Sequence, residues 1–380
     1  MLPNYAGGSL VNLVASLVAA RGGAARHREL DLMPARELSD ARNVVLLIVD
    51  GLGDRYVRQR GAGGELARRR RGALTSVFPS TTASAITTSY TGCTPLEHGL
   101  TGWFTYFGQA GCVAAALPFR SRGDLALLSA RGVTTSQLYS ASSIFASLPV
   151  RSIVVSYRDI IDSHYNSRHC EGAERRAYQK VEELVSEVEA AVKSGTEKKF
   201  IYAYWPEYDA ISHRHGSESA EAFARFSELD AAFGMLVKRL AGTESAIVVT
   251  ADHGFIDAGR GDCLELPAQL LSMLRFPLCG ERRVAYCHVH SPAEFQNKAQ
   301  DWLGPRGEAR MSRELVDEGW FGDGVPHPRL AERVGDVTLV MNERFTVKDW
   351  LPGEPRHLHI GNHGGISEDE MTIPLIVESA

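Results

Sequence analysis

The chain has 380 residues, which is enough to bury a substantial core and by length alone allows two or three domains. Hydrophobic residues make up 44% of the chain and charged residues 23%, which is the balance of an ordinary globular protein. The formal net charge of −5 gives nucleic-acid binding no electrostatic support, and the short basic run at residues 68–71 is typical of a solvated surface loop.

The first apolar run, residues 9–20, is followed by the basic cluster "ARHR". A signal peptide has the opposite order, and the run is too short to span a bilayer. We therefore expect an amphipathic helix packed on the core and no membrane segment. The six cysteines have no CxxC spacing, which indicates free thiols in a reducing compartment. The cytoplasm is the expected location.

The segment "NVVLLIVD", residues 43–50, is typical of a strand that is buried on both faces of a parallel sheet. Similar runs follow at residues 151–156, 198–205, 245–252 and 372–379. Helical patterns lie between them, from Val181 to Val192 and from Phe223 to Leu240. Strands that alternate with long helices predict an α/β fold, with a mostly parallel central sheet covered by helices on both faces.

Residues 255–360 break this alternation. They combine short strand-like runs with the helix-like segment "AEFQNKAQDWLG" and many glycines and prolines. We interpret them as a smaller inserted α+β cap subdomain. The catalytic core then consists of residues 1–254 and 361–380.

Acidic residues and histidines follow several of the predicted strands. They are Asp50, Asp209, His213, Asp252, His253 and His363. In open α/β sheets, ligands bind beyond the carboxyl ends of the strands, so we expect these side chains to converge there. Asp209 and His213 are four residues apart, which places them on one face of a helical turn.

These six residues offer oxygen and nitrogen ligands that suit zinc, with manganese or iron as alternatives. Six protein ligands are too many for one tetrahedral ion, but they suit two divalent ions that each keep an open position. Each motif alone has a plainer explanation, because Asp-Gly after a strand is usually a turn and Asp-x-x-x-His is often a surface pair. Their order and context together favour a two-metal site.

Three consecutive hydroxyl residues, Ser80, Thr81 and Thr82, lie between an apolar run and a helix-like run. A two-metal site at the mouth of an α/β sheet suits in-line displacement at phosphorus, which needs a nucleophile. A metal ion beside a hydroxyl lowers its pKa, and a helix N-terminus offers N–H groups to phosphate oxygens. The local sequence leaves open which of the three hydroxyls acts.

The motifs "VDGLG", "FPSTTAS...TGCTPLEHG", "YDAISH", "TADHG" and "NHGG" follow one another from Asp50 to His363. In this order they resemble the alkaline phosphatase superfamily, and within it the nucleotide pyrophosphatase/phosphodiesterase branch. The resemblance implies an alkaline phosphatase-like fold. The branch pattern Phe-Pro-Thr-x-Thr, laid on "FPSTT", implies that Thr82 is the nucleophile and that Ser80 and Thr81 are capping or supporting hydroxyls.

The same resemblance divides the ligands between two ions. One ion would be held by Asp209, His213 and His363. The other would be held by Asp50, Asp252 and His253, with Thr82 beside it. The expected partner is a small-molecule phosphate ester or nucleotide, neither a nucleic acid nor a membrane.

The sequence departs from this branch after the "HG" motif, where the branch has an Asn that binds a phosphate oxygen. Here Gly102 and Trp103 follow instead. We expect the missing contact from backbone N–H groups or from Arg120, which suits a bidentate clamp on phosphate, with Arg122 as a weaker candidate. An ion pair of Arg120 with Asp124 is the plainer alternative. Trp103 and the aromatic residues after it suit stacking on a base, although such runs more often belong to a core.

We therefore predict a metal-dependent phosphoric ester hydrolase, a phosphodiesterase or nucleotide pyrophosphatase that forms a phosphothreonine intermediate at Thr82. A monoester phosphatase or phosphomutase of the same superfamily is the alternative within this chemistry. The alternative from another class is a non-catalytic protein that binds metal or ligand. The sulfatase pattern does not fit, because "CTPLE" has Glu97 where that pattern has Arg. The oligomeric state stays open.

Overall fold

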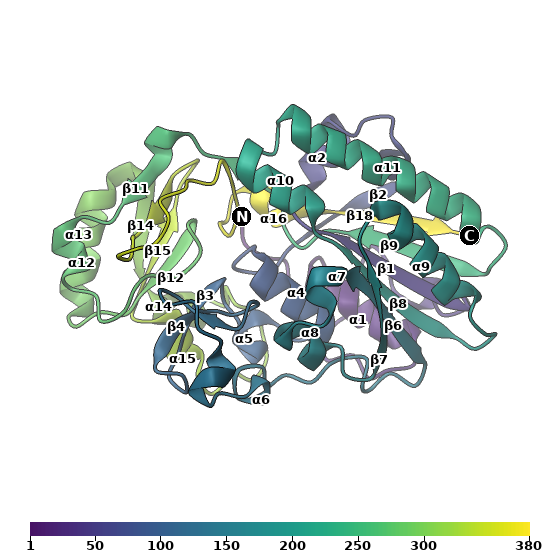
Figure 1. Ribbon diagram of the computed structural model, residues 1–380, viewed down its shortest axis with the longest axis horizontal. Coiled ribbons are helices and arrows are strands. Elements are labelled where there is room, and N and C mark those ends of the chain that lie inside the picture. Colours follow the sequence, from purple (N-terminus) through teal and green to yellow (C-terminus); the bar gives the residue numbers. More distant parts are fainter.

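The computed structural model describes residues 1–380 and has two lobes, each built on a seven-stranded sheet (Figure 1). The strands of the central sheet are β1 (Asn43–Val49), β2 (Arg70–Thr75), β6 (Arg151–Tyr157), β7 (Ala173–Tyr178), β8 (Lys199–Trp205), β9 (Ser245–Thr250) and β18 (Thr372–Ser379). Their order is β2-β18-β9-β1-β8-β6-β7. The five strands from β9 to β7 run parallel, whereas β18 is antiparallel to both of its neighbours. The predicted mostly parallel sheet is confirmed, and all five predicted strand segments belong to it.

Helices cover both faces of the central sheet (Figure 1). Those around it are α1 (Leu10–Ala20), α2 (Asp54–Gln59), α3 (Glu65–Arg68), α4 (Thr82–Thr91), α7 (Arg158–Ile161), α8 (His164–His169), α9 (Val181–Lys193), α10 (Glu207–His215), α11 (Ala220–Leu240) and α16 (Glu368–Met371). On one face, side chains of α9 and α11 meet Val45 and Leu47 of β1. On the other face, α1 packs beside α4. The predicted covering of both faces is confirmed.

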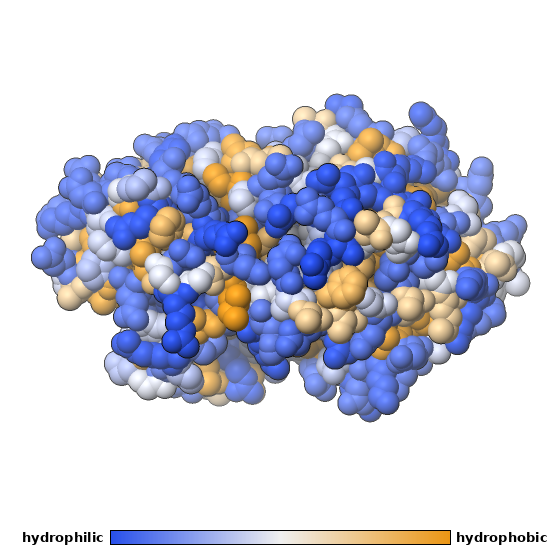
Figure 2. Space-filling model, turned by 90° about the horizontal axis from the view of Figure 1, so that it is seen from above, coloured by the Kyte–Doolittle hydropathy of each residue, from blue (hydrophilic) through white to orange (hydrophobic).

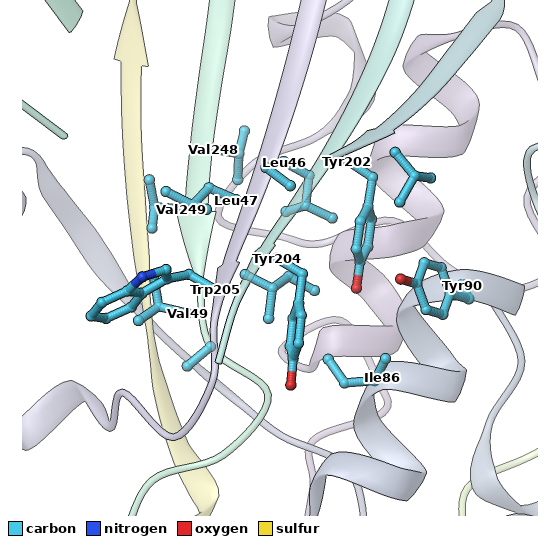
Figure 3. Close-up of a cluster of buried hydrophobic side chains, with 14 of the residues drawn as sticks. Leu46, Leu47, Val49, Ile86, Tyr90, Tyr202, Tyr204, Trp205, Val248 and Val249 are labelled. Atoms are coloured by element: carbon cyan, nitrogen blue, oxygen red, sulfur yellow. The ribbon is translucent and has the colours of Figure 1, made fainter. Parts of the chain in front are cut away.

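The core beneath α4 also positions a predicted site residue (Figure 3). Tyr202 of β8 stacks on Tyr90 of α4 with ring centroids 4.6 Å apart, and its hydroxyl lies 2.8 Å from the Ser89 hydroxyl. Tyr204 lies two residues further along β8, so it points to the same face of the sheet. Its hydroxyl donates a hydrogen bond to Asp50 Oδ2. The packing of the sheet thus fixes one carboxylate at the end of β1.

The basic run at residues 68–71 is not the predicted surface loop. Arg70 and Arg71 begin β2, an edge strand of the central sheet. The Arg70 guanidinium forms two hydrogen bonds with the buried Asp54 carboxylate, at 2.5 and 3.0 Å. Because an edge strand exposes one side to solvent, it accommodates charged side chains that a central strand excludes.

The second lobe contains an antiparallel sheet. Its strands are β3 (Phe104–Phe107), β4 (Cys112–Ala115), β5 (Arg120–Ser121), β12 (Cys279–Gly280), β13 (Val284–Cys287), β14 (Gly307–Met311) and β15 (Val337–Met341). Their order is β14-β15-β13-β12-β3-β4-β5. The remaining helices are α5 (Pro95–His98), α6 (Thr135–Leu138), α12 (Ala268–Leu271), α13 (Pro292–Leu303), α14 (Ser312–Asp317) and α15 (Leu330–Val334).

Two small two-stranded sheets complete the fold. β10 (Ile256–Asp257) pairs with β17 (Gly361–Asn362), and β11 (Cys263–Glu265) pairs with β16 (Thr346–Lys348). The second lobe takes β3, β4 and β5 from residues 104–121, which lie outside the predicted insertion. The division into residues 255–360 and a core formed by the rest of the chain stays a prediction.

A buried ion pair joins the two lobes. Arg283, next to β13, pairs with Glu370 of α16 through two hydrogen bonds of 3.0 and 2.9 Å, and both side chains are almost completely buried. Glu370 Oε1 also accepts the Gly365 N–H at 2.8 Å. The pair therefore holds the glycine turn that follows His363.

The surface seen in Figure 2 is mostly hydrophilic, with hydrophobic side chains gathered in small, separate groups. None of the helices is both long enough and apolar enough to span a membrane.

Candidate active site

Three neighbouring strands of the central sheet, β9, β1 and β8, run parallel and end at one edge of the sheet. Asp50 directly follows β1, and Asp252 and His253 come just after β9. Asp209 and His213 lie on α10, which begins just after β8. Residues that follow adjacent parallel strands lie at the same edge of the sheet, so five of the predicted ligands lie together here.

His363 reaches the same place from the other end of the chain, just after β17. We call Asp209, His213 and His363 the first ligand group; one ligand atom from each lies within 4.8 Å of the others. The Nε2 atom of His213 is 3.3 Å from Asp209 Oδ1 and 3.2 Å from the Nε2 atom of His363. The Nδ1 atom of His213 is 2.9 Å from the Gly361 carbonyl, a contact that leaves Nε2 as the nitrogen facing the group.

We call Asp50, Asp252 and His253 the second ligand group. The Nε2 atom of His253 is 3.4 Å from Asp50 Oδ1 and 3.4 Å from Asp252 Oδ2. The other oxygen of Asp252 accepts the Gly51 N–H at 3.0 Å. Asp209 of the first group also lies close to Asp50 and His253, so the two groups are contiguous.

Each of the three aspartates keeps one buried carboxylate oxygen without a hydrogen-bond partner. These atoms are Asp50 Oδ1, Asp209 Oδ1 and Asp252 Oδ2. An unpaired ionised oxygen in the interior is costly, and buried charges are normally paired or bound to a metal. Three such oxygens beside three imidazoles form a donor set that fits divalent cations.

The pKa values reflect the same crowding of negative charge. Burial raises the pKa of Asp50 to about 6 and that of Asp252 to about 8, with the Asp50 charge adding to the latter. Burial and the same neighbouring carboxylates raise the pKa of Asp209 well above its usual range. Burial lowers the pKa of His213 to about 4, which keeps this imidazole neutral and able to bind a cation. A bound cation would favour the charged carboxylates that burial disfavours.

The Thr82 side chain lies beside the second ligand group. Thr82 is the first residue of α4, and its hydroxyl oxygen is 3.1 Å from His253 Nε2. The first N–H groups of a helix have no intrahelical acceptor and attract anions. Of the three adjacent hydroxyls, the Thr82 hydroxyl is therefore the one that faces both the candidate ligands and a ready anion site.

The other two hydroxyls are engaged elsewhere. The Ser80 hydroxyl donates to the Gly365 carbonyl at 2.7 Å. Thr81 is the N-cap residue of α4, but its side chain makes no capping hydrogen bond and instead donates to Glu281 Oε1 at 2.5 Å. Both hydroxyls connect the start of α4 to segments that come much later in the sequence. They support the turn, as expected, although neither side chain caps the helix.

A cavity of about 400 Å³ opens beside the ligand groups, a size suited to a small molecule. Thr82, Asp209, His213 and His363 line its inner part. Much of the remaining wall comes from the second lobe, with Trp103, Phe104, Arg122, Glu281, Arg282 and Lys348. The predicted substrate contact Trp103 thus lies at the cavity, and its backbone N–H donates to Glu281 at 2.7 Å.

Arg120, the preferred candidate for a phosphate clamp, does not reach the cavity. Its exposed side chain donates to the Leu125 carbonyl at 2.8 Å, because the chain turns back at the edge strand β5. Arg122, the weaker candidate, lines the cavity instead. Its buried guanidinium lies 2.8 Å from Asp349 and 3.1 Å from Glu354.

Sequence reasoning missed Glu281 and Arg282. They lie in the turn "CGERRV" between β12 and β13, where no motif or spacing distinguishes them from surface charges. Glu281 accepts hydrogen bonds from both Thr81 and Trp103, so the turn is held against the start of α4. Only the pairing of the second sheet brings these residues to the cavity.

Comparison with known proteins gives one family match. The sequence pattern of the family described as type I phosphodiesterase / nucleotide pyrophosphatase matches residues 44–366. No curated protein sequence matches the chain.

Several solved structures share the fold. Murine ectonucleotide pyrophosphatase/phosphodiesterase 5 is 17% identical with a TM-score of 0.64, over 89% of this chain and 88% of that one. An inactive form of the murine protein in complex with AMP gives 17% identity and a TM-score of 0.64, over 87% of each chain. Phosphonoacetate hydrolase from Sinorhizobium meliloti 1021 in complex with phosphonoacetate is 17% identical with a TM-score of 0.65, over 89% of this chain and 90% of that one. At these identities the likeness concerns the fold.

Proposed function

Because the chain belongs to the type I phosphodiesterase / nucleotide pyrophosphatase family, we propose that it hydrolyses phosphate diesters or nucleotide pyrophosphates with Thr82 as the nucleophile. The position of the Thr82 hydroxyl, 3.1 Å from His253 Nε2 in the first turn of α4, carries this proposal. There the hydroxyl meets the candidate metal ligands and the free N–H groups of a helix start. A protein that only binds metal has no use for a hydroxyl in that position.

The first and second ligand groups would each hold one divalent ion. When bound, such ions lower the pKa of a neighbouring hydroxyl and stabilise the charge that develops on phosphate oxygens. The mixture of carboxylate oxygens and imidazole nitrogens supports zinc, with manganese or iron as alternatives. The unpaired oxygens of the three aspartates support this assignment.

Thr82 Oγ1 would give up its proton to solvent and attack phosphorus in line with the leaving oxygen. A bond from Thr82 to phosphorus forms while the bond to the departing alcohol or nucleoside phosphate breaks, and the free N–H groups of α4 hold the non-bridging oxygens. A water oxygen then bonds to phosphorus while the bond from Thr82 to phosphorus breaks, which releases a phosphate monoester, and a proton from the water restores the Thr82 hydroxyl. Thr81 and Ser80 would hold the turn in place through Glu281 and Gly365.

The test compares the hydrolysis of bis-(p-nitrophenyl) phosphate and p-nitrophenyl phosphate by purified protein of known metal content. We expect a preference for the diester, and we expect Thr82→Ala to lower turnover by roughly 10³- to 10⁶-fold, the range seen when a nucleophile is removed. Thr91→Ala is the matched control, since it makes the same substitution at the other end of α4, where the hydroxyl donates to the Thr87 carbonyl at 2.7 Å. Metal content should stay unchanged in both variants.

Rapid acid quenching during turnover adds an independent readout. Mass spectrometry should find a phosphorylated peptide that contains Thr82, and the modification should disappear in Thr82→Ala. Normal activity of Thr82→Ala would refute the nucleophile assignment. A preference for the monoester would instead place the protein with the phosphatases or phosphomutases.

We also propose a reducing compartment such as the cytoplasm. All six cysteines are free, and four of them are buried. Alkylation of protein denatured directly from cells, without reductant, should label all six thiols; a missing label would contradict this location.

A further inference from the structure

Three basic side chains of the second lobe line the cavity, and two of them already have acidic partners. Arg122 lies between Asp349 and Glu354, at 2.8 and 3.1 Å. The ammonium group of Lys348 is 3.5 Å from Glu354 and lies 4.4 Å from the centre of the Trp350 ring. Their charge is therefore largely balanced by the protein itself.

Arg282 is the third basic residue, and no carboxylate oxygen lies within 4.0 Å of its guanidinium. Its side chain donates one hydrogen bond, to the His357 carbonyl at 3.3 Å. A guanidinium has five N–H donors, so most of the hydrogen-bonding capacity of this half-buried group is unused. The adjacent Arg283 makes the contrast clear, because its guanidinium is fully engaged by Glu370 and two backbone carbonyls.

The position of Arg282 relative to the reaction centre is fixed by its backbone. The preceding residue, Glu281, accepts the Thr81 hydroxyl at 2.5 Å, and the Arg282 carbonyl accepts the Val347 N–H at 2.8 Å. Arg282 and Thr82 line the same cavity. A ligand whose phosphorus lies at Thr82 would therefore extend toward a cation that has no partner.

One aromatic ring of the cavity wall is already covered by a charged group of the protein. The guanidinium carbon of Arg122 lies 4.8 Å from the centre of the Phe104 ring and covers that face. Trp103 is tied through its backbone to Glu281. The wall therefore offers a ligand the unpaired Arg282 guanidinium, beside a Phe104 ring that Arg122 already covers.

We propose that Arg282 binds a second anionic group of the substrate, a carboxylate or a phosphate, on the part of the molecule beyond the phosphorus attacked by Thr82. The inference rests on the proposed function, since it takes the Thr82 end of the cavity as the reaction centre. A bidentate contact with a guanidinium selects planar carboxylates and phosphates over neutral groups. Arg282 is then a specificity-determining residue for substrates with two anionic groups.

The test measures binding by calorimetry to metal-loaded Thr82→Ala protein, so that no probe is turned over. One arm compares phosphonoacetate with phosphonoacetamide, which lacks the second charge. The other arm compares methylenediphosphonate with methylphosphonate. In at least one pair, Arg282→Gln should weaken the binding of the probe with two anionic groups by about 10- to 100-fold more than the binding of the probe with one.

Two further variants make the result specific. Arg356→Gln removes the same charge from the neighbouring loop but outside the cavity lining, so it should leave both affinity ratios unchanged. Arg282→Lys keeps the positive charge but lacks the bidentate guanidinium, so it should restore part of the affinity ratio between the two probes. The arm that shows the larger loss identifies the second group as carboxylate or phosphate.

The outcomes separate this inference from the proposed function. The proposed role of Arg282 is wrong if the affinity ratios are the same in the Thr82→Ala parent, in Arg282→Gln and in Arg356→Gln. This holds even if the enzyme with Thr82 intact hydrolyses bis-(p-nitrophenyl) phosphate. The opposite result is also informative. If the enzyme with Thr82 intact hydrolyses no ester, but Arg282→Gln alone changes the affinity ratio, the hydrolase proposal fails and the anion site is supported.

Discussion

The two lobes treat buried charge in opposite ways. At the end of the central sheet, Asp50, Asp209 and Asp252 lie together, and each keeps an unpaired oxygen. In the second lobe, Arg122 is neutralised by Asp349 and Glu354. Unbalanced negative charge at one side of the cavity suits bound cations, whereas at the other side Arg122 and Lys348 are paired and Arg282 alone keeps a charge that a ligand can meet. The comparison separates the part of the cavity suited to chemistry from the part suited to choosing the substrate.

We expect the largest effect from the removal of one unpaired carboxylate. Asp252→Asn keeps an acceptor for the Gly51 N–H but loses the negative charge beside His253. We expect loss of one metal equivalent per chain and a fall in activity larger than the roughly 10- to 100-fold that loss of an outer partner costs. Metal analysis and diester hydrolysis measure the two effects.

A matched control for this variant lies beyond β6, another strand of the same sheet. Asp162→Asn changes an exposed aspartate that pairs with Arg175 at 3.1 Å. Both metal content and activity should stay unchanged in it. Full metal occupancy in Asp252→Asn would show that the second ligand group does not bind an ion.

The buried ion pair between the lobes should give the next largest effect, on stability. Arg283→Met leaves the Glu370 carboxylate buried without its partner, which should lower the free energy of unfolding by about 3–5 kcal/mol. Denaturant unfolding measures this change. Because Glu370 also holds the turn after His363, we expect weaker metal binding as well.

Arg283→Met/Glu370→Gln should recover part of the lost stability, since glutamine is uncharged and still offers an acceptor to the Gly365 N–H. Arg313→Met, which removes an exposed arginine paired with Asp317, should change stability little. If the double variant is no more stable than Arg283→Met, the buried charge is not the source of the loss.

The smallest expected effect is a pH dependence of the stability of the metal-free protein. Asp252 has a pKa of about 8 in the folded, metal-free protein, and the pKa of Asp209 is also raised. The folded state therefore binds more protons than the unfolded state near neutral pH, so the stability of the metal-free protein should fall as pH rises from about 6.5 to 8. Above pH 6.5 the lowered pKa of His213 no longer opposes this trend.

Thermal unfolding of chelator-treated protein measures this slope, which is at most about 1.4 kcal/mol per pH unit for each proton. Metal binding needs deprotonated carboxylates, so the stabilisation by added zinc should grow over the same range. Asp252→Asn should flatten the slope. A stability that rises with pH in the metal-free protein would contradict the raised pKa values.

Five of the seven strands of the central sheet could be predicted from the sequence, whereas the two edge strands, β2 and β7, could not. Runs such as residues 43–50 and 245–252 are apolar throughout because both faces of a parallel strand are covered, and that pattern is visible without any structure. The ligand residues follow directly, because topology brings the ends of parallel strands to one edge. The selection of Thr82 needed the family resemblance, since three adjacent hydroxyls look alike in one sequence.

The second lobe and its side of the cavity depend on contacts between distant parts of the chain. Its sheet joins β3, β4 and β5 to strands more than 150 residues later, and no local pattern encodes such antiparallel pairing. Arg120 and Arg122 are equivalent in sequence, yet the turn at an edge strand exposes one and buries the other. Arg282 could not be distinguished from the paired Arg283, because whether a charge has a partner depends on residues that only the fold brings near.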